Sequence, residues 1–174
     1  MNYQYLDFSS KEKLIDGIVL RRLEIHKDPT GSLVETLRSD WSDVYNQKDL
    51  NFAMQYMSIT PPAIARDEDK WHTHQNQKDR FICVEGRIVT ACFDPRGNSK
   101  TQDMLNLFIM GPEKIDEMYM VVIPEEVYHG FMVISPSPGY LLNFPTQLYN
   151  PQDEGRVSNN QFSWQKVRED FSLE

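Results

Sequence analysis

The stretch that decides the fold covers residues 71–86 and is WHTHQNQKDRFICVEG. His72 and His74 stand two residues apart in an extended pattern, so on a strand both imidazole rings lie on one face. Asp79 follows five residues after His74, and Gly86 follows seven residues after Asp79. The apolar runs on either side of Gly86 predict a β-hairpin that turns at this glycine.

Short apolar segments recur on both sides of this hairpin, with glycine and proline between them. They are residues 18–20, 23–26, 33–37, 52–59, 71–75, 80–84, 87–93, 104–110, 118–123, 131–134 and 140–144. Strands at this spacing are typical of an all-β sandwich or barrel. We therefore predict a single domain of residues 1–174 with its core at about 18–150. Residues 151–174 form a peripheral C-terminal segment in this prediction.

The composition is that of an ordinary globular domain with an excess of acid. The chain has 174 residues, of which 40% are hydrophobic, and 26 acidic residues against 18 basic ones give a net charge of −8. That charge repels polyanions, so we expect neither nucleic acid nor an anionic membrane surface as a partner. No run of 18 apolar residues is present, which predicts no transmembrane segment.

The first residues and the two cysteines indicate in which cellular compartment the protein works. Residues 1–13 contain no apolar run typical of a signal peptide. Cys83 and Cys92 flank the predicted turn, but a tight turn would pair Cys83 with a residue near position 88, about 13 Å short of Cys92. We therefore expect two buried free thiols and a cytoplasmic protein.

The histidine stretch resembles the metal-binding pattern of the cupins, in which a second, distant motif completes the site. That second motif is here Pro124, four further residues and His129. Three imidazoles and a carboxylate suit a divalent transition metal. This interpretation predicts a metal-dependent isomerase or dioxygenase whose ligands are His72, His74, Asp79 and His129.

A closer resemblance covers about residues 18–157. The stretches that carry it occur in order and are 28–35 (DPTGSLVE), 65–74 (ARDEDKWHTH), 77–81 (QKDRF), 93–96 (FDPR), 124–131 (PEEVYHGF) and 143–149 (NFPTQLY). They resemble the dTDP-4-dehydrorhamnose 3,5-epimerase family, which is itself a cupin-type jelly roll. The resemblance implies an all-β, cupin-type jelly-roll barrel with short peripheral helices.

The resemblance also implies a reaction in which a base removes a proton next to a C4 ketone and a proton returns on the other face. His72 matches the family's catalytic base, and an imidazole suits this role because its pKa is near neutral. Arg80 falls where the family has a lysine near the developing oxyanion. The implied substrate contacts are Glu35 and Gln55 on the nucleotide side, Arg66 and Lys70 near the sugar or diphosphate, and His129 in the second motif.

The chain departs from the family at three positions. Asn143 stands where the family has a catalytic tyrosine, and an amide does not act as a proton donor of that kind. We nevertheless expect Asn143 to face the cavity as part of the catalytic set. Thr30 replaces an arginine of the early motif. The carboxylate partner of the base, which the family has in its C-terminal region, has no clear match, and Asp170 is the candidate for it.

Three functions are therefore compatible with the sequence. The first is a cofactor-free epimerase of a nucleotide-linked 4-keto-6-deoxysugar that acts at C3, at C5 or at both. The second is the metal-dependent cupin enzyme, and the third is a non-catalytic binder of a sugar nucleotide. The resemblance further implies a homodimer in which N-terminal strands cross to the partner's sheet, which would cover exposed strand edges.

Overall fold

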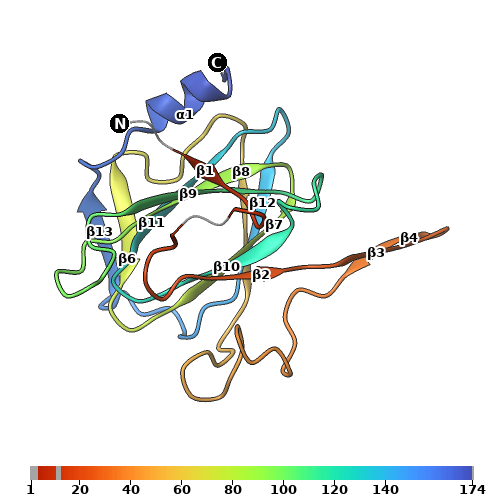
Figure 1. The fold of residues 1–174 in the computed structure, drawn as a ribbon, viewed down its shortest axis with the longest axis horizontal. Helices are drawn as coiled ribbons and strands as arrows, with labels where there is room; N and C mark the ends of the chain where they lie inside the picture. The colour runs from red at the N-terminus through yellow and green to blue at the C-terminus, as the bar shows by residue number, and fades with distance from the viewer. Residues whose placement is uncertain (1–3, 11–12, 174) are drawn as a thin grey trace.

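A computed structural model describes residues 4–10 and 13–173, which fold into two β-sheets that face each other (Figure 1). The order of the six-stranded sheet is β1 (Tyr5–Leu6), β9 (Leu105–Met110), β8 (Ile88–Phe93), β11 (Tyr128–Val133), β6 (Lys70–His74) and β13 (Glu154–Ser158). The order of the five-stranded sheet is β2 (Val19–Arg22), β10 (Tyr119–Ile123), β7 (Asp79–Glu85), β12 (Gly139–Asn143) and β5 (Tyr56–Thr60). This arrangement confirms the predicted all-β jelly-roll barrel.

The core lies between the two sheets, and strand alternation decides which side chains enter it. On β7, Phe81 and Cys83 point inward, whereas Ile82 between them packs on the outer face. On β8, Ile88 and Cys92 are likewise buried in the barrel. Both cysteines are free and buried, as predicted. The predicted hairpin at Gly86 is wrong, however, because β7 and β8 lie in different sheets and the chain crosses from one sheet to the other at this turn.

The C-terminal segment covers the outer face of the six-stranded sheet. Phe162 stacks on Trp71 of β6 with the ring centroids 6.2 Å apart, and it contacts Trp164 edge-on at 4.8 Å. Trp164 begins the helix α1 (Trp164–Asp170), and no helix within residues 4–10 and 13–173 is long and apolar enough to cross a bilayer.

The segment 151–174 is more than a peripheral addition. Its strand β13 pairs with β6 over five residue pairs and completes the six-stranded sheet. The sequence did not predict this strand because its partner lies far away in the chain, and because its residues EGRVS lack an apolar run.

A two-stranded hairpin stands out from the barrel beside β2 (Figure 1). It consists of β3 (Ile25–Asp28) and β4 (Gly31–Val34), and we call it the arm. The predicted turn is present, since the Asp28 carboxylate accepts a 2.7 Å hydrogen bond from the backbone N–H of Thr30. Leu33 of the arm is 62% exposed, so the arm presents apolar surface to solvent.

Candidate functional site

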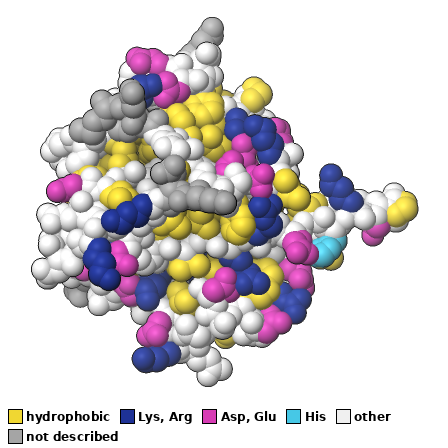
Figure 2. Space-filling view, in the orientation of Figure 1, with side chains coloured by type: hydrophobic (Ala, Val, Ile, Leu, Met, Phe, Trp, Pro, Cys, Tyr) yellow, Lys and Arg dark blue, Asp and Glu magenta, His cyan; other side chains and the backbone are white. Residues whose placement is uncertain are grey.

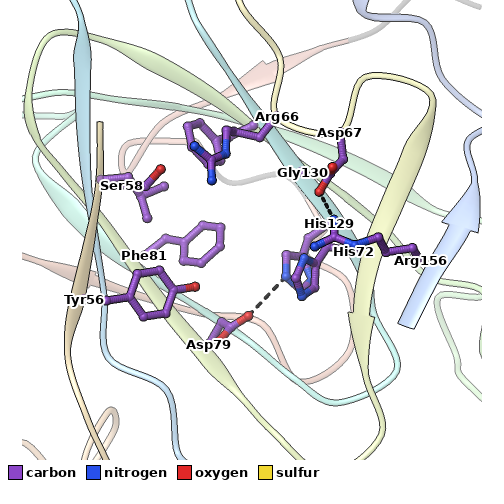
Figure 3. A pocket seen from close by; sticks show the side chains of 12 residues that line it. Tyr56, Ser58, Arg66, Asp67, His72, Asp79, Phe81, His129, Gly130 and Arg156 are labelled. Atoms are coloured by element: carbon purple, nitrogen blue, oxygen red, sulfur yellow. Dashed lines mark hydrogen bonds and ion pairs between the residues drawn. The ribbon is translucent and has the colours of Figure 1, made fainter. Parts of the chain in front are cut away.

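A cavity opens between the two sheets at the end where β6, β7 and β11 carry polar residues (Figure 3). Both sheets and the loop before β6 contribute to its wall. The lining residues are Tyr56, Ser58, Arg66, Asp67, His72, Asp79, Phe81, His129, Gly130, Phe131, Leu141 and Arg156.

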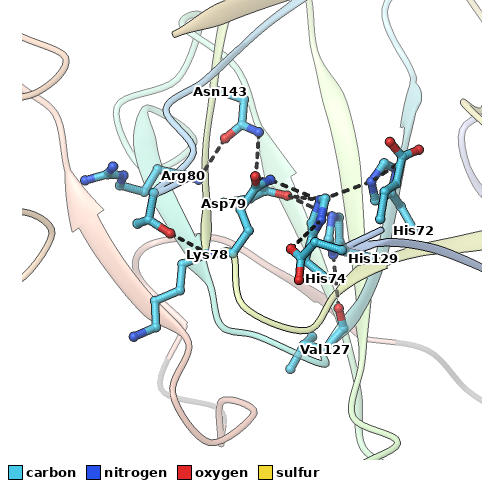
Figure 4. Close-up of polar contacts among 12 residues, drawn as sticks. His72, His74, Lys78, Asp79, Arg80, Val127, His129 and Asn143 are labelled. Atoms are coloured by element: carbon cyan, nitrogen blue, oxygen red, sulfur yellow. Dashed lines mark hydrogen bonds and ion pairs between the residues drawn. The ribbon is translucent and has the colours of Figure 1, made fainter. Parts of the chain in front are cut away.

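Three histidines meet at this end of the barrel (Figure 4). His72 and His74 share the inner face of β6, and β11 pairs with β6 so that His129 lies opposite His72. The ring centroids of His72 and His74 are 4.7 Å apart, and those of His72 and His129 are 5.4 Å apart. The two-residue spacing thus places both imidazoles of the pair on one strand face.

Asp79 is the buried carboxylate of this cluster. Its Oδ2 lies 3.1 Å from His129 Nε2 and 3.6 Å from His74 Nε2. Its Oδ1 accepts hydrogen bonds of 2.8 Å from the amides of Gln77 and Asn143. Burial alone would raise the pKa of Asp79, but hydrogen bonding and charge from His129, the charge of His74 and the Asn143 hydrogen bond lower it to about 2.

His72 presents a neutral ring to the cavity. Burial lowers its pKa to about 3, and the neighbouring His129 and His74 contribute to this lowering. Burial also lowers the pKa of His74, although the charge of Asp79 opposes it. His72 is therefore unprotonated at neutral pH, as a base must be, but the lowered pKa makes it a weaker base than a free imidazole.

The carboxylates beside the histidine pair come from β13 and the residue before it. Asp153 Oδ2 lies 3.5 Å from His74 Nδ1, and both atoms are buried without a hydrogen-bond partner within the usual distance. Glu154 Oε1 lies 3.9 Å from His72 Nε2. These two acids therefore surround the pair from the side of the six-stranded sheet.

Asp170 is not the partner of His72, and that expectation is wrong. Asp170 lies on α1, outside the barrel, where it accepts a 2.7 Å hydrogen bond from Tyr5 and pairs with Lys166. The sequence indicated a C-terminal acid but not which one, because the pairing of β13 with β6 decides it.

Arg80 points away from the cavity, although we expected it beside the enolate. Asp79 and Phe81 occupy the inner face of β7, so Arg80 between them lies on the outer face. Its guanidinium is fully buried and donates hydrogen bonds of 2.6–3.0 Å to backbone carbonyls, which belong to Phe144, Val44, Leu50 and Asn51. This placement does not fit an enolate contact and indicates that Arg80 holds the 44–51 segment against the barrel.

Three more of the predicted substrate contacts lie away from the cavity. Glu35 follows the arm and binds Arg38 at 2.7 Å. Gln55 is exposed just before β5, and Lys70 is exposed at the start of β6. Within one chain, these three residues do not line the cavity.

The cluster also contains the donor set of a metal site. His74, Asp79 and His129 each offer one ligand atom, and these atoms lie within 4.8 Å of one another. His129 Nδ1 lies 3.0 Å from the Val127 carbonyl oxygen, a contact of the kind that orients ligating histidines. The amide nitrogen of Gln77, however, lies 3.0 Å from His74 Nε2 and 2.8 Å from Asp79 Oδ1. The Gln77 amide would have to move before an ion could bind His74 Nε2, whereas Gln77 does not bond Asp79 Oδ2, the oxygen that faces both His74 and His129.

Comparison with known proteins identifies the family. A family model described as dTDP-4-dehydrorhamnose 3,5-epimerase matches residues 12–167. The chain belongs to this epimerase family. Among its relatives is a Haloferax volcanii protein named "Probable low-salt glycan biosynthesis epimerase", which is 36% identical over 140 residues, or 80% of this chain and 83% of the relative. The family resemblance read from the motifs is therefore confirmed, and the chain is a sugar-nucleotide epimerase.

Solved structures of the epimerase family share the fold. The dTDP sugar isomerase from Desulfovibrio desulfuricans G20 superposes with a TM-score of 0.77 at 22% identity, covering 88% of this chain and 96% of that chain. A second structure is the dTDP-6-deoxy-D-glucose-3,5-epimerase from Legionella pneumophila Philadelphia 1, solved with dTDP-4-keto-L-rhamnose. It superposes with a TM-score of 0.73 at 20% identity, covering 85% of this chain and 76% of that chain. These likenesses support the cupin-type jelly roll.

Two arginines line the cavity of the epimerase, and sequence reasoning found only one of them. Arg66 points into the cavity from the loop before β6 (Figure 3). Arg156 of β13 pairs in register with His72 and binds the carboxylates of Asp67 and Glu154. Arg156 was missed because residues 151–174 were assigned to the periphery.

Tyr56 is the other lining residue that the sequence did not single out. β5 pairs with β12 so that Tyr56 lies opposite Asn143, and the Asn143 amide donates a 2.9 Å hydrogen bond to the Tyr56 hydroxyl. Asn143 itself is buried behind this hydroxyl and behind Asp79. No motif indicates Tyr56, because its relation to Asn143 depends on long-range strand pairing.

Proposed function

We propose that this epimerase acts on a dTDP-linked 4-keto-6-deoxysugar and inverts it at C3, at C5 or at both. The observation that carries the proposal is the imidazole of His72 in a cavity that two arginines also line. A hydrogen next to a ketone is acidic because the ketone oxygen accepts the negative charge, so a positioned imidazole can remove it. The Legionella relative was solved with a ligand of this chemical class.

The lining residues divide naturally into roles in this reaction. His72 is the base, and His129 beside it contacts the substrate. Arg66 and Arg156 provide the guanidinium groups that suit a diphosphate, despite the net charge of −8 of the chain. The Ser58 hydroxyl is buried without a hydrogen-bond partner, so it is available to the enolate oxygen in place of Arg80.

We further propose that the reaction needs no cofactor, because proton abstraction next to a ketone requires only a positioned base and a group that stabilises the enolate. In deuterated water, the purified protein is expected to place solvent deuterium at C3 or C5 of dTDP-4-keto-6-deoxyglucose. Proton NMR reads the two positions separately. Dialysis against EDTA is expected to leave the rate unchanged.

Two other outcomes would contradict this proposal in different ways. Stoichiometric metal in the purified protein, together with loss of exchange after dialysis, would support the metal-dependent cupin enzyme that uses His72, His74, Asp79 and His129. Tight binding of the sugar nucleotide without any exchange would instead support the non-catalytic binder.

A homodimer is our proposal for the assembly. The arm projects from the barrel (Figure 2), and Leu33 on it is 62% exposed. The edge strand β5 exposes Met57 and Ile59 by 50% and 51%. Apolar side chains gathered on strand edges are typical of interfaces. An arm that crosses to a partner would also explain why Glu35 lies away from the cavity of its own chain.

Light scattering is expected to give twice the 20.4 kDa mass of one chain. Leu33→Asp should shift the protein towards the monomer, because it places a charge on the exposed arm. Ile115→Asp is the matched control, since Ile115 is 71% exposed on the loop before β10, away from the arm. A wild-type mass of 20.4 kDa would contradict the dimer.

We also propose that the protein works in the cytoplasm. Cys83 and Cys92 are free and buried, and burial raises the pKa of Cys83 to about 12. Such thiols are unreactive, and two free cysteines suit a reducing compartment.

A further inference from the structure

We propose that Tyr56 is the general acid of the epimerase and delivers a proton to the substrate carbon from the face opposite His72. This inference rests on the proposed function and assigns a residue to a step for which Asn143 of β12 offers only an amide. Four observations support it, and each concerns a different property of the residue.

The first observation is the position of the hydroxyl. Tyr56 and Asn143 are directly paired residues of antiparallel strands, so their side chains lie next to each other on one face of the sheet. Asn143 Nδ2 lies 2.9 Å from Tyr56 Oη. The phenol therefore lies one strand away from Asn143, where the family resemblance implies a tyrosine.

The second observation is the direction of that hydrogen bond. The Asn143 amide can only donate through its nitrogen, so the Tyr56 oxygen is the acceptor. The hydroxyl proton of Tyr56 is then free to be donated into the cavity that the residue lines. After proton transfer, the same amide would stabilise the phenolate oxygen.

The third observation is the charge around Tyr56. Burial and the negative charge of Asp79 raise the pKa of Tyr56 to about 12, although the residue as a whole is 43% exposed. The phenol is therefore protonated at neutral pH. Within the described residues that line the cavity, Tyr56 is the only tyrosine.

The fourth observation is the placement of Tyr56 and His72 on different sheets. Tyr56 comes from β5 of the five-stranded sheet, and His72 comes from β6 of the six-stranded sheet. Their side chains point into the cavity from opposite sides (Figure 3). A sugar ring bound between them would have one of its faces towards His72 and the other towards Tyr56, which is what inversion at a carbon requires.

The step balances with these two residues alone. His72 takes the proton from the carbon next to the ketone, and the C–H electron pair forms the enolate. The enolate then forms a new C–H bond with the hydroxyl proton of Tyr56 on the other face, and the ketone is restored. Tyr56 is left as phenolate and His72 as imidazolium, and exchange with water returns both to their starting states.

Tyr56→Phe tests the inference because it keeps the ring and removes only the hydroxyl. We expect inversion to fall by about 10²- to 10⁴-fold, the usual contribution of a general acid. Deuterium exchange without inversion should persist, because His72 can return a solvent deuteron to the face from which it took the proton. NMR in deuterated water measures exchange and epimer formation on the same sample.

Tyr140→Phe is the matched control, because Tyr140 lies on the same strand pair but does not line the cavity. Its inversion rate should equal that of the wild type. Inversion by Tyr56→Phe at the wild-type rate would overturn the inference. A parallel loss of exchange and inversion would overturn it too, since Tyr56 would then bind the substrate rather than protonate it. A wild type without exchange would instead contradict the proposed function itself.

Discussion

His72→Asn is expected to lower deuterium exchange and epimer formation together by about 10²- to 10⁴-fold, the contribution of a positioned general base. Asparagine keeps a polar side chain of similar length but has no lone pair of sufficient basicity. The loss should appear in exchange as well as in inversion, because no enolate forms without proton abstraction. This pattern differs from that of Tyr56→Phe, in which exchange should survive.

Two other histidine variants make the His72 result specific. His26→Asn should behave as wild type, because His26 is an exposed residue of the arm. His74→Asn tests the rival assignment, since His74 lies between Asp153 and Asp79 rather than on the cavity wall. If exchange survived in His72→Asn and disappeared in His74→Asn, the base would be His74 and our assignment would be wrong.

Arg80→Met is expected to destabilise the protein strongly and to leave the chemistry of the folded fraction intact. The change removes a buried cation that binds four backbone carbonyls, and unpaired buried polar groups are costly. A loss of about 3–5 kcal/mol in the free energy of unfolding follows, or about 6–20 °C in the melting temperature. Thermal unfolding followed by circular dichroism measures it.

Arg80 could hold the 44–51 segment against the barrel or stabilise the enolate. The deuterium exchange rate per folded molecule decides between these two roles. It should be unchanged in Arg80→Met, because every hydrogen bond of the guanidinium leads away from the cavity. Arg38→Met is the control for loss of a surface arginine, and its melting temperature should remain close to that of the wild type. A stable Arg80→Met protein with a large loss of exchange would restore the enolate role that the sequence suggested.

Much of the fold could be predicted because the relevant signals are local. The two-residue spacing of His72 and His74 places both rings on one face wherever the strand lies. The apolar runs on either side of Gly86 predicted two strands with a turn between them, and β7 and β8 confirm this, although the two strands join different sheets instead of pairing as a hairpin. Cys83 and Cys92 are free, as predicted. Each of these features depends on neighbours within about 20 residues, so periodicity and turn chemistry are sufficient to find it.

The candidate site was less predictable because the whole barrel decides which face of each strand points into the cavity. Asp79 and Arg80 are adjacent on a strand, so one side chain points into the barrel and the other points out of it. The sequence does not say which of the two points inward. Pairing of β7 with β10 and β12 in the barrel turns Asp79 inward and Arg80 to the outer face. Placing Arg80 in the cavity was wrong for that reason.

By itself, the sequence determined the strand pattern and the family, because these depend on residue types at fixed short spacings. It placed His129 with His72 and His74 only through the resemblance to the cupin pattern. The tertiary structure alone decided which polar side chains share the cavity. Tyr56 meets Asn143, and Arg156 lies opposite His72, through strand pairs formed by distant segments. Such contacts depend on backbone hydrogen bonds that any residues can make, so the residues leave no local signature of them.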